Sequence, residues 1–233
     1  MLINIIGNPS LKKLLELAKS SDIILDAGAG DLKYTKYLMN MGYSVIPVDV
    51  LVPKDIENIP FIQSSIENLP FRDNTFDFVF CILVIGYVEK DQKAIDEFYR
   101  VLKKGSFLVI SFQSSLSAYR LLIDLENLLK INTYTNNLQS QYSEYNQKTH
   151  YYTNTQAKSM LNKFKIEQLY GYNLNFIPRL LSIFYKAIFG KNSRPDNIIK
   201  VSTSLYNKVE NKTYKNRFLT EFCYDKVIVC KKE

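Results

Sequence analysis

The sequence predicts an α/β fold built on a doubly wound, mostly parallel sheet. Short apolar runs alternate with amphipathic stretches along residues 8–112, and this alternation is typical of parallel strands joined by right-handed helical crossovers. Residues 76–83 are apolar at nearly every position, as expected of a strand buried on both faces. Residues 23–26 form an apolar run that breaks into Gly28 and Gly30 before a helix begins, and such loops lie at the ligand sites of open parallel sheets.

Three helices are expected between these strands. The first opens at Asn8-Pro9-Ser10, since proline suits an early helical position, and its inward side chains are Leu11, Leu14, Leu15 and Ala18. The second ends at Gly42, and its inward side chains at the spacing of one helix face are Tyr34, Tyr37, Leu38 and Met41. The third is capped by Asp91 and ends in the region of Gly105, with inward side chains Ile95, Phe98, Tyr99 and Leu102.

Five strands are expected in this part of the chain, at residues 23–26, 44–48, 61–63, 76–83 and 107–112. Residues 131–156 are rich in Asn, Gln, Ser, Thr and Tyr, a composition typical of a lid or a disordered segment. Residues 178–220 read as helical decoration and include an amphipathic stretch over 179–189. We therefore expect a single domain over residues 1–233, with 178–220 as a helical insertion or lid before the last strand.

Composition narrows the function classes. A chain of 233 residues fits one α/β domain. Cys81, Cys223 and Cys230 are not spaced as a disulfide framework or a zinc site, so we expect no metal and a reducing, cytoplasmic location. No secretory signal is visible at the amino terminus. The net charge of +7 is unevenly distributed, with −2 in residues 1–110 and +9 in residues 111–233. The basic half suits either an anionic partner or a solvated surface.

The loop after residues 23–26 has the chemistry of an adenosine-binding site. Glycine lets the backbone approach a ligand closely, so Gly28 and Gly30 are candidate cofactor contacts. Asp49 ends the second strand, 23 positions after Asp26, which is the usual place for an acid that accepts hydrogen bonds from ribose hydroxyls. The sequence therefore predicts a cofactor that contains adenosine.

The residues around this loop favour S-adenosylmethionine over NAD. Lys33 occupies the place of the third glycine in the dinucleotide fingerprint. Asp31 at the start of the helix would repel a pyrophosphate, and Asp26 adds a second carboxylate. S-adenosylmethionine carries a sulfonium and an ammonium group, so two carboxylates suit it.

These residues also resemble a known family. Asp26-x-Gly28-x-Gly30 is similar to motif I of the class I S-adenosylmethionine-dependent methyltransferases. Three later stretches resemble the small-molecule branch of that family: residues 65–79, residues 97–105 (the family's Glu-x-x-Arg-Val-Leu-Lys-Pro-Gly) and His150-Tyr151-Tyr152-Thr153 ahead of a helix. The resemblance covers roughly residues 20–175. It departs from the family at Leu32, where a third glycine is frequent, and at Ser65, where an Asp often contacts the adenine amino group.

The resemblance implies a seven-stranded Rossmann-like sheet and further cofactor residues. It places an antiparallel last strand at residues 222–230, paired with about 166–174. It brings Ser65 and Ile66 to the adenine, Val50 against the adenine face and Cys81 beside the methionine moiety. The expected cofactor residues are thus Asp26, Gly28, Gly30, Asp49, Val50, Ser65, Ile66 and Cys81. Asp26 is expected to orient the loop or to lie near the cofactor's amino group through water.

The expected function is in-line methyl transfer from S-adenosylmethionine to a small-molecule or lipid-like acceptor. Positioning supplies most of the rate, because the sulfonium is already a good leaving group. No catalytic residue is assigned. The candidates for a base or an acceptor contact are His150, the only histidine, which titrates near neutral pH, and Tyr87, just after the strand at 76–83.

Two alternatives to this function stay open. One is an RNA or protein methyltransferase that uses the basic half of the chain. The other is a non-catalytic cofactor-binding scaffold of the same fold. Nucleic acid is not the expected partner, because neither the Asn/Asp-Pro-Pro-Tyr/Phe motif nor an RNA-binding module is present. The amphipathic stretch over 179–189 is a candidate for peripheral membrane contact.

Overall fold

The chain forms two compact units in the computed structural model. The first comprises Met1–Phe112, Thr155–Leu169 and Val227–Glu233, and the second comprises Gln113–Asn154 and Tyr170–Lys226. The structure describes residues 8–56, 58–117, 149–172, 180, 184–185, 188 and 219–233. Most of the predicted lid at 131–156 and most of the predicted insertion at 178–220 lie outside these residues. The prediction of a single functional domain therefore stays a prediction.

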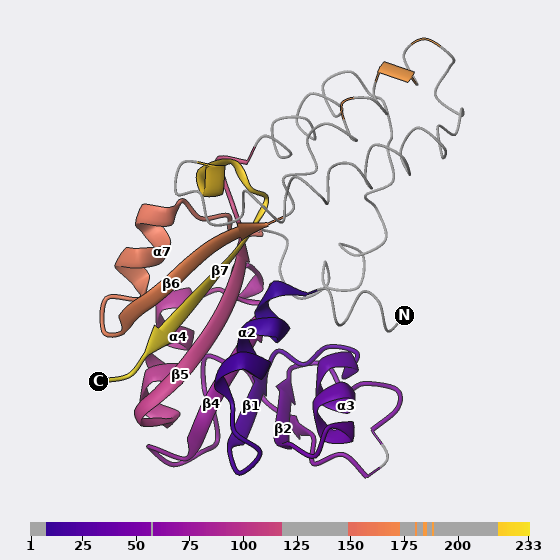
Figure 1. Ribbon diagram of the computed structural model, residues 1–233. Coiled ribbons are helices and arrows are strands. Elements are labelled where there is room, and N and C mark those ends of the chain that lie inside the picture. The colour runs from indigo at the N-terminus through magenta and orange to yellow at the C-terminus, as the bar shows by residue number, and fades with distance from the viewer. Residues whose placement is uncertain are drawn as a thin grey trace. The chain divides into compact units, whose positions relative to one another are not determined.

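A seven-stranded sheet provides the framework, in the order β3-β2-β1-β4-β5-β7-β6 (Figure 1). Its strands are β1 (Ile23–Ala27), β2 (Ser44–Asp49), β3 (Ile62–Gln63), β4 (Phe76–Ile82), β5 (Leu102–Gln113), β6 (Lys165–Tyr172) and β7 (Asp225–Lys231). β1 pairs in parallel with β2 and β4, β2 pairs in parallel with β3, and β4 with β5. The predicted α/β fold with a mostly parallel sheet is confirmed.

The last strand runs antiparallel to β5. At the start of β5, the Gly105 amide donates to the Lys232 carbonyl (2.7 Å) and the Lys232 amide donates to the Ser106 carbonyl (2.9 Å). Just past its end, the Ser114 amide donates to the Tyr224 carbonyl (2.7 Å). Early residues of β5 thus pair with late residues of β7, which defines an antiparallel ladder. β7 lies between β5 and β6, so the expected pairing of the last strand with residues near 166–174 is confirmed.

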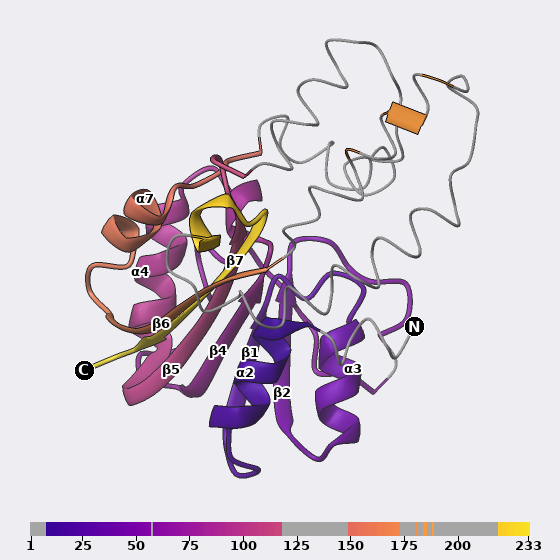
Figure 2. The same cartoon turned by 45° about the horizontal axis from the view of Figure 1, so that its top comes forward.

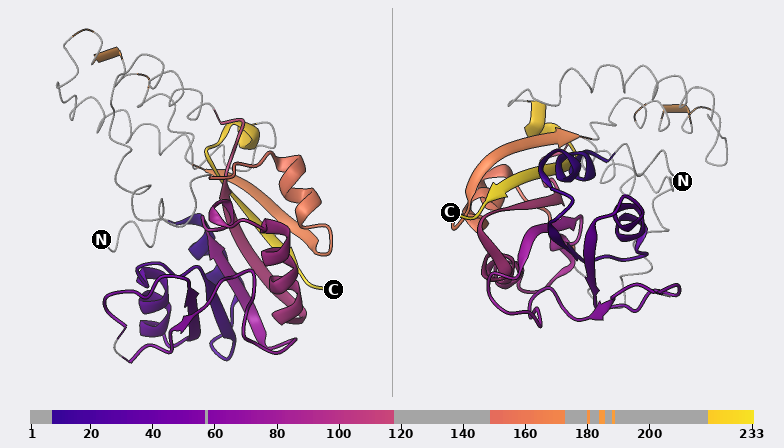
Figure 3. Two further views of the ribbon diagram at one scale, coloured as in Figure 1. Left: turned by 180° about the vertical axis from the view of Figure 1, so that it is seen from behind. Right: turned by 60° about the horizontal axis from the view of Figure 1, so that its bottom comes forward.

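Helices cover both faces of the sheet. α2 (Pro9–Leu17) and α3 (Lys33–Asn40) lie on one face, whereas α4 (Asp91–Val101) and α7 (Asn154–Met160) lie on the other (Figures 2 and 3). α2 begins at Pro9 as predicted, and Asn8 caps it, since the Asn8 Oδ1 accepts from the amides of Ser10 (2.8 Å) and Leu11 (3.2 Å). The described part also contains the short 3₁₀ helices η1 (Ile85–Tyr87) and η2 (Leu219–Phe222).

The core lies between these helices and the central strands. The middle parts of β1, β4 and β5 are mostly apolar on both faces because helices cover both faces. Their most deeply buried side chains include Ile24, Leu25, Phe78, Val79, Phe80, Leu108, Val109 and Ile110. This arrangement holds the carboxyl ends of the parallel strands in fixed places, and the candidate site lies there.

Several predicted details are wrong. β5 begins at Leu102, directly after α4, so Gly105 lies inside the strand with φ +82° and does not end the helix. Lys90 takes the N-cap position of α4, and Asp91 is its first helical residue. Met41 follows the end of α3 and is 51% exposed, because the helical spacing that would turn it inward stops at Asn40.

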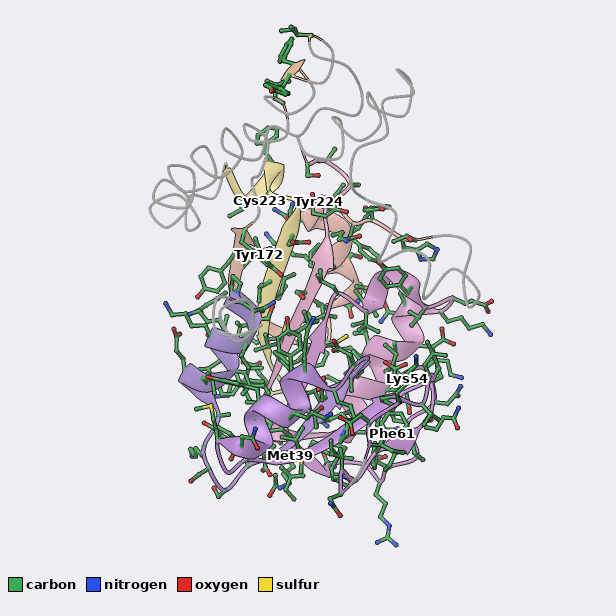
Figure 4. The ribbon with its side chains drawn as sticks, turned by 90° about the vertical axis from the view of Figure 1, so that its right-hand side faces the viewer. Met39, Lys54, Phe61, Tyr172, Cys223 and Tyr224 are labelled. Carbon is green, nitrogen blue, oxygen red and sulfur yellow. The ribbon has the colours of Figure 1, made fainter. Side chains whose placement is uncertain are left out.

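The last strand also begins later than predicted. Residues 219–222 form η2, so β7 starts at Asp225 rather than at 222. Within the second unit, Gly171 of β6 packs so closely on η2 and the residue after it that a Cβ there would come within 3.0 Å of Cys223 and of the Thr220 backbone. Figure 4 labels Tyr172 and Cys223 in this region.

Candidate functional site

The glycine loop after β1 is hydrogen-bonded to the end of β2. The amides of Gly28 and Ala29 both donate to the Val48 carbonyl, at 2.8 and 3.0 Å. Gly28 has φ +81° and Gly30 has φ +54°, a left-handed conformation that glycine adopts without steric cost. The loop therefore requires glycine at these two positions for its own geometry.

Leu32 explains one departure from the family pattern. It precedes α3 with φ +61° and ψ 15°, also left-handed, which explains why a glycine is frequent at this position. A left-handed conformation costs a leucine roughly 1–2 kcal/mol. The Leu32 side chain is completely buried, and burial of a leucine contributes roughly 1.5–3 kcal/mol. The leucine is thus tolerated because the core holds its side chain.

Gly28 also allows two loops to pack together. A Cβ at Gly28 would come closer than 3.0 Å to three side-chain atoms of Val84, in the loop after β4. Protein interiors have no room for such an overlap. Val84 thus occupies the space beside Gly28 that a side chain would need, and the contact of Gly28 with a ligand stays a prediction.

Asp49 lies at the end of β2 with 5% of its surface exposed. Its Oδ2 accepts from the Gly30 amide (2.8 Å) and its Oδ1 accepts from the Leu51 amide (3.0 Å). A carboxylate has about four acceptor positions, and these bonds use one on each oxygen. Asp49 is therefore held in a fixed orientation while each oxygen keeps a further acceptor position.

Asp26 is buried at the end of β1, with 3% of its surface exposed. The hydroxyl of Thr35, on α3, donates to its Oδ2 at 2.6 Å. Burial raises the pKa of Asp26 to about 6, the Thr35 hydrogen bond opposes this, and the charges of Asp49 and Asp31 add to it. The sequence analysis missed Thr35, although a threonine among the inward positions of α3 was the available signal.

Asp26→Asn is expected to change how stability depends on pH. Because burial raises the pKa of the Asp26 carboxyl, the folded state binds a proton there more tightly than the unfolded state does. Protonation of Asp26 therefore stabilises the fold fully below about pH 4, and this stabilisation is lost as the pH rises through about 6. Asn cannot ionise, so the variant does not lose this stabilisation. The unfolding free energy of the variant minus that of the wild type should therefore increase by roughly 2–3 kcal/mol from pH 4 to pH 7.5. Urea unfolding at both pH values measures this difference, and parallel pH profiles of the two proteins would contradict it.

The loop after β3 is anchored to Asp49. The Ser64 amide donates to the Asp49 carbonyl (3.0 Å), and Gln63 Nε2 donates to the Val50 carbonyl (3.0 Å). Ser65 is half-buried, its hydroxyl accepts from the Glu67 amide (3.1 Å), and Ile66 is 4% exposed. The first unit thus gathers the predicted residues of β2 and of the loop after β3 at one edge of the sheet. Figure 4 labels Phe61 just before β3.

The remaining candidates have different surroundings. Cys81 is completely buried in β4, and burial strongly raises the pKa of its thiol, with the Asp26 charge adding to it. Such a thiol is inert. Tyr87 is half-buried in η1, where its amide donates to the Val84 carbonyl (2.9 Å). His150 is half-buried in the second unit, and its role stays a prediction.

Metal sites and membrane spans can be judged for the residues that the structure describes. No group of three or more His, Cys, Asp and Glu side chains among them is arranged to hold a metal ion. None of the described helices is both long and apolar enough to cross a membrane.

Part of the chain is similar to known methyltransferases. Residues 25–110 match the family described as "Methyltransferase domain". The malonyl-[acyl-carrier protein] O-methyltransferase of Buchnera aphidicola is 32% identical over 121 residues, which cover 49% of this chain and 48% of that protein. The ubiquinone/menaquinone biosynthesis C-methyltransferase UbiE of Haemophilus ducreyi is 42% identical over 55 residues, 24% of this chain and 21% of that protein. The chain therefore spans about half the length of these curated relatives or less.

A solved structure shares the fold. The 1,6-didemethyltoxoflavin-N1-methyltransferase of Burkholderia thailandensis, with bound 1,6-didemethyltoxoflavin and S-adenosylhomocysteine, aligns with a TM-score of 0.56 over 97% of this chain and 77% of that one. The two sequences are 14% identical. The likeness concerns the fold of the two proteins.

Proposed function

We propose that the protein transfers a methyl group from S-adenosylmethionine to a small-molecule or lipid-like acceptor. The premise is that residues 25–110, which match the family described as "Methyltransferase domain", lie on a seven-stranded sheet of the class I S-adenosylmethionine-dependent methyltransferase type. The observation that carries the proposal is Asp49. Its carboxylate is buried at the end of β2, oriented by two backbone amides, and keeps an acceptor position on each oxygen. This is the chemistry that binds a pair of ribose hydroxyls.

The residues of this edge fit the cofactor. Asp49 would accept hydrogen bonds from the ribose hydroxyls, and the loop at Gly28 and Gly30 would lie against the cofactor backbone-first. Ser65 and Ile66 would contact the adenine, with Val50 packed on its face. Cys81 would lie near the methionine moiety, and its buried, inert thiol fits a packing role there.

The chain's own contribution is positioning and charge. S-adenosylmethionine supplies an electrophilic methyl group on a positively charged sulfur. The buried Asp26 carboxylate, with a pKa raised to about 6, is mostly ionised at pH 7.5, so it places a negative charge beneath the glycine loop. Holding the acceptor in line with the methyl group is the main demand on the protein. Tyr87 and His150 are the candidates for contacting the acceptor or removing a proton.

The acceptor class follows the two curated relatives. One acts on malonyl-[acyl-carrier protein] and the other in ubiquinone/menaquinone biosynthesis, by their names. We take an acceptor of this kind, small or lipid-like, as the working substrate class. An RNA or protein acceptor and a non-catalytic scaffold are the alternatives that the experiment must separate.

The test combines cofactor binding with turnover. S-adenosylhomocysteine should raise the melting temperature in proportion to its affinity, and NAD should not. Incubation with radiolabelled S-adenosylmethionine should then label a small-molecule or lipid fraction of a cell extract. Label in RNA or protein would support the first alternative, and binding without labelling would support the scaffold. Absence of S-adenosylhomocysteine binding would overturn the proposal.

Contact with a membrane surface belongs to this proposal. Phe184 and Ile188 are helical, four positions apart, and 58% and 73% exposed. Residues four apart share one helix face. Within the stretch 179–189, they would insert into the interface of a bilayer that holds a lipid-like acceptor.

Phe184→Glu is expected to reduce flotation with anionic liposomes at low salt. The physical reason is the loss of apolar insertion, together with repulsion between the new carboxylate and anionic lipid. Met41→Glu, at an apolar position of the first unit that is 51% exposed, is the matched control and should float like the wild type. A wild-type protein that never floats, or equal flotation of both variants, would exclude membrane contact through this helix.

A further inference from the structure

The loop between β3 and β4 is fastened to α4 by a carboxylate–guanidinium pair. Arg100 donates to Glu97 through Nε and Nη2, both at 2.8 Å, so the two side chains are bidentate. Glu97 Oε2 also accepts from the amide of Leu69, at 2.7 Å. Hydrogen bonding to Arg100 keeps the pKa of Glu97 below its usual value. Glu97 thus fixes a backbone amide of the loop with an ionised carboxylate.

Arg100 fixes the backbone carbonyls of the same loop. Its Nη2 donates to the Leu69 carbonyl (3.0 Å), and its Nη1 donates to the Phe71 carbonyl (2.7 Å) and to Asp73 Oδ1 (2.9 Å). Together, Glu97 and Arg100 hold both the amide and the carbonyl of Leu69, whose side chain is 5% exposed. Hydrogen bonds with an ionised partner are about twice as strong as neutral ones. The segment from Leu69 to Asp73 is therefore firmly attached to α4.

The other end of the loop is attached to the end of β2, at Asp49, the proposed ribose contact. The Ser64 amide donates to the Asp49 carbonyl (3.0 Å), and the Ser64 hydroxyl donates to the Asn68 carbonyl (2.9 Å). The Glu67 carboxylate accepts from the Lys90 amide (2.9 Å), just before α4. Residues 65 and 66 thus lie between one attachment to Asp49 and several to α4.

We propose that Glu97 and Arg100 are positioning residues that hold the loop at Ser65 and Ile66 in the place where its backbone can contact the adenine of the cofactor. This inference rests on the proposed function, because it assumes that the cofactor's base lies at this loop. Recognition of a base by backbone groups requires those groups to be held within about half an ångström of their working positions. Glu97 and Arg100 supply that constraint from α4 without contacting the ligand.

The first experiment uses the ligand-free protein. In Arg100→Met and Glu97→Ala, hydrogen exchange of the backbone amides over residues 65–71 should accelerate by about tenfold, because one or more charge-assisted bonds to the loop are lost. Asp96→Asn is the matched control. Asp96 also lies on α4, but its ion pair is with Lys163 (2.9 Å) and not with the loop. Exchange outside the loop should stay unchanged. Unaltered exchange over 65–71 in both variants would overturn the proposal.

The second experiment measures discrimination between bases. S-Inosylhomocysteine differs from S-adenosylhomocysteine in the purine alone, so calorimetry with the two compounds isolates contacts to the base. Arg100→Met should lower the affinity for S-adenosylhomocysteine by about tenfold and also lower its preference over the inosyl compound. Glu97→Gln keeps an acceptor oxygen for the Leu69 amide and should restore part of both. Asp96→Asn should match the wild type.

The two possible failures are distinguishable. Absence of S-adenosylhomocysteine binding by the wild type would overturn the proposed function, whereas the exchange experiment needs no ligand. Tight binding by every variant, with an unchanged preference for the adenine base, would overturn the positioning role and leave the proposed function standing. If Glu97→Ala fails to fold, Glu97→Gln and Arg100→Met provide the same comparison.

Discussion

Asp49→Ala should weaken the binding of S-adenosylhomocysteine by at least about tenfold while leaving a folded protein. Two ribose hydroxyls would lose a charged acceptor, and a hydrogen bond to a charged group is worth roughly 1.5–3 kcal/mol, where 1.4 kcal/mol corresponds to about tenfold in affinity. The amides of Gly30 and Leu51 would lose their acceptor as well, which loosens the loop. Isothermal titration calorimetry measures the affinity, and circular dichroism checks the fold.

Asp55→Ala is the matched control for this experiment. Asp55 is an exposed carboxylate in the loop after β2, where it pairs with Lys36 at 2.6 Å. Exposed ion pairs contribute little to stability, so this variant should bind like the wild type. A folded Asp49→Ala protein with unchanged affinity would remove Asp49 from the cofactor site.

Gly28→Ala should destabilise the protein by about 3 kcal/mol. A left-handed φ of +81° costs an alanine roughly 1–2 kcal/mol, and the overlap of its Cβ with Val84 adds roughly 1–3 kcal/mol. Gly42→Ala is the control, because Gly42 has a similar φ of +89° but open space at the Cβ position. It should cost only the conformational part.

A double-mutant cycle separates the two contributions to the Gly28→Ala effect. Val84→Ala removes the atoms that the new Cβ would meet, so the double variant should be more stable than the sum of the two single effects predicts. Chemical denaturation measures all four proteins. Equal losses at Gly28 and Gly42, or strict additivity with Val84→Ala, would show that the packing against Val84 carries no energetic weight.

The sequence predicted the central strands well because their burial leaves a clear pattern. A parallel strand covered on both faces is apolar at almost every position, and in β4 the only polar residue is Asp77, near its start. Element boundaries were predicted less well. β5 takes in Gly105, which a local interpretation assigns to a helix end, because its early residues pair with the last strand through Lys232. The partner is far away in sequence, so no local signal shows it.

In the candidate site, too, some residues could be predicted from local sequence and others could not. Asp49 and the two glycines were predicted as site residues from their spacing, since the order of strand, loop and helix places them at the carboxyl ends of the strands in any such sheet. Thr35 was missed because its bond to Asp26 depends on the rotation of α3 against β1. The role of Glu97 and Arg100 was missed as well, although the motif that contains them was noticed, because their partners lie some 28 positions earlier in the chain.

The sequence by itself determined the α/β fold, the glycine loop and the acid that ends β2, because periodicity and residue chemistry are local properties. The tertiary structure alone decided which atoms meet: Val84 fills the space beside Gly28, Thr35 donates to Asp26, and α4 holds the loop beside Ser65. The physical reason is that a hydrogen bond or a packing contact requires two groups within a few ångströms, and the separation of these groups along the chain carries no information about that distance.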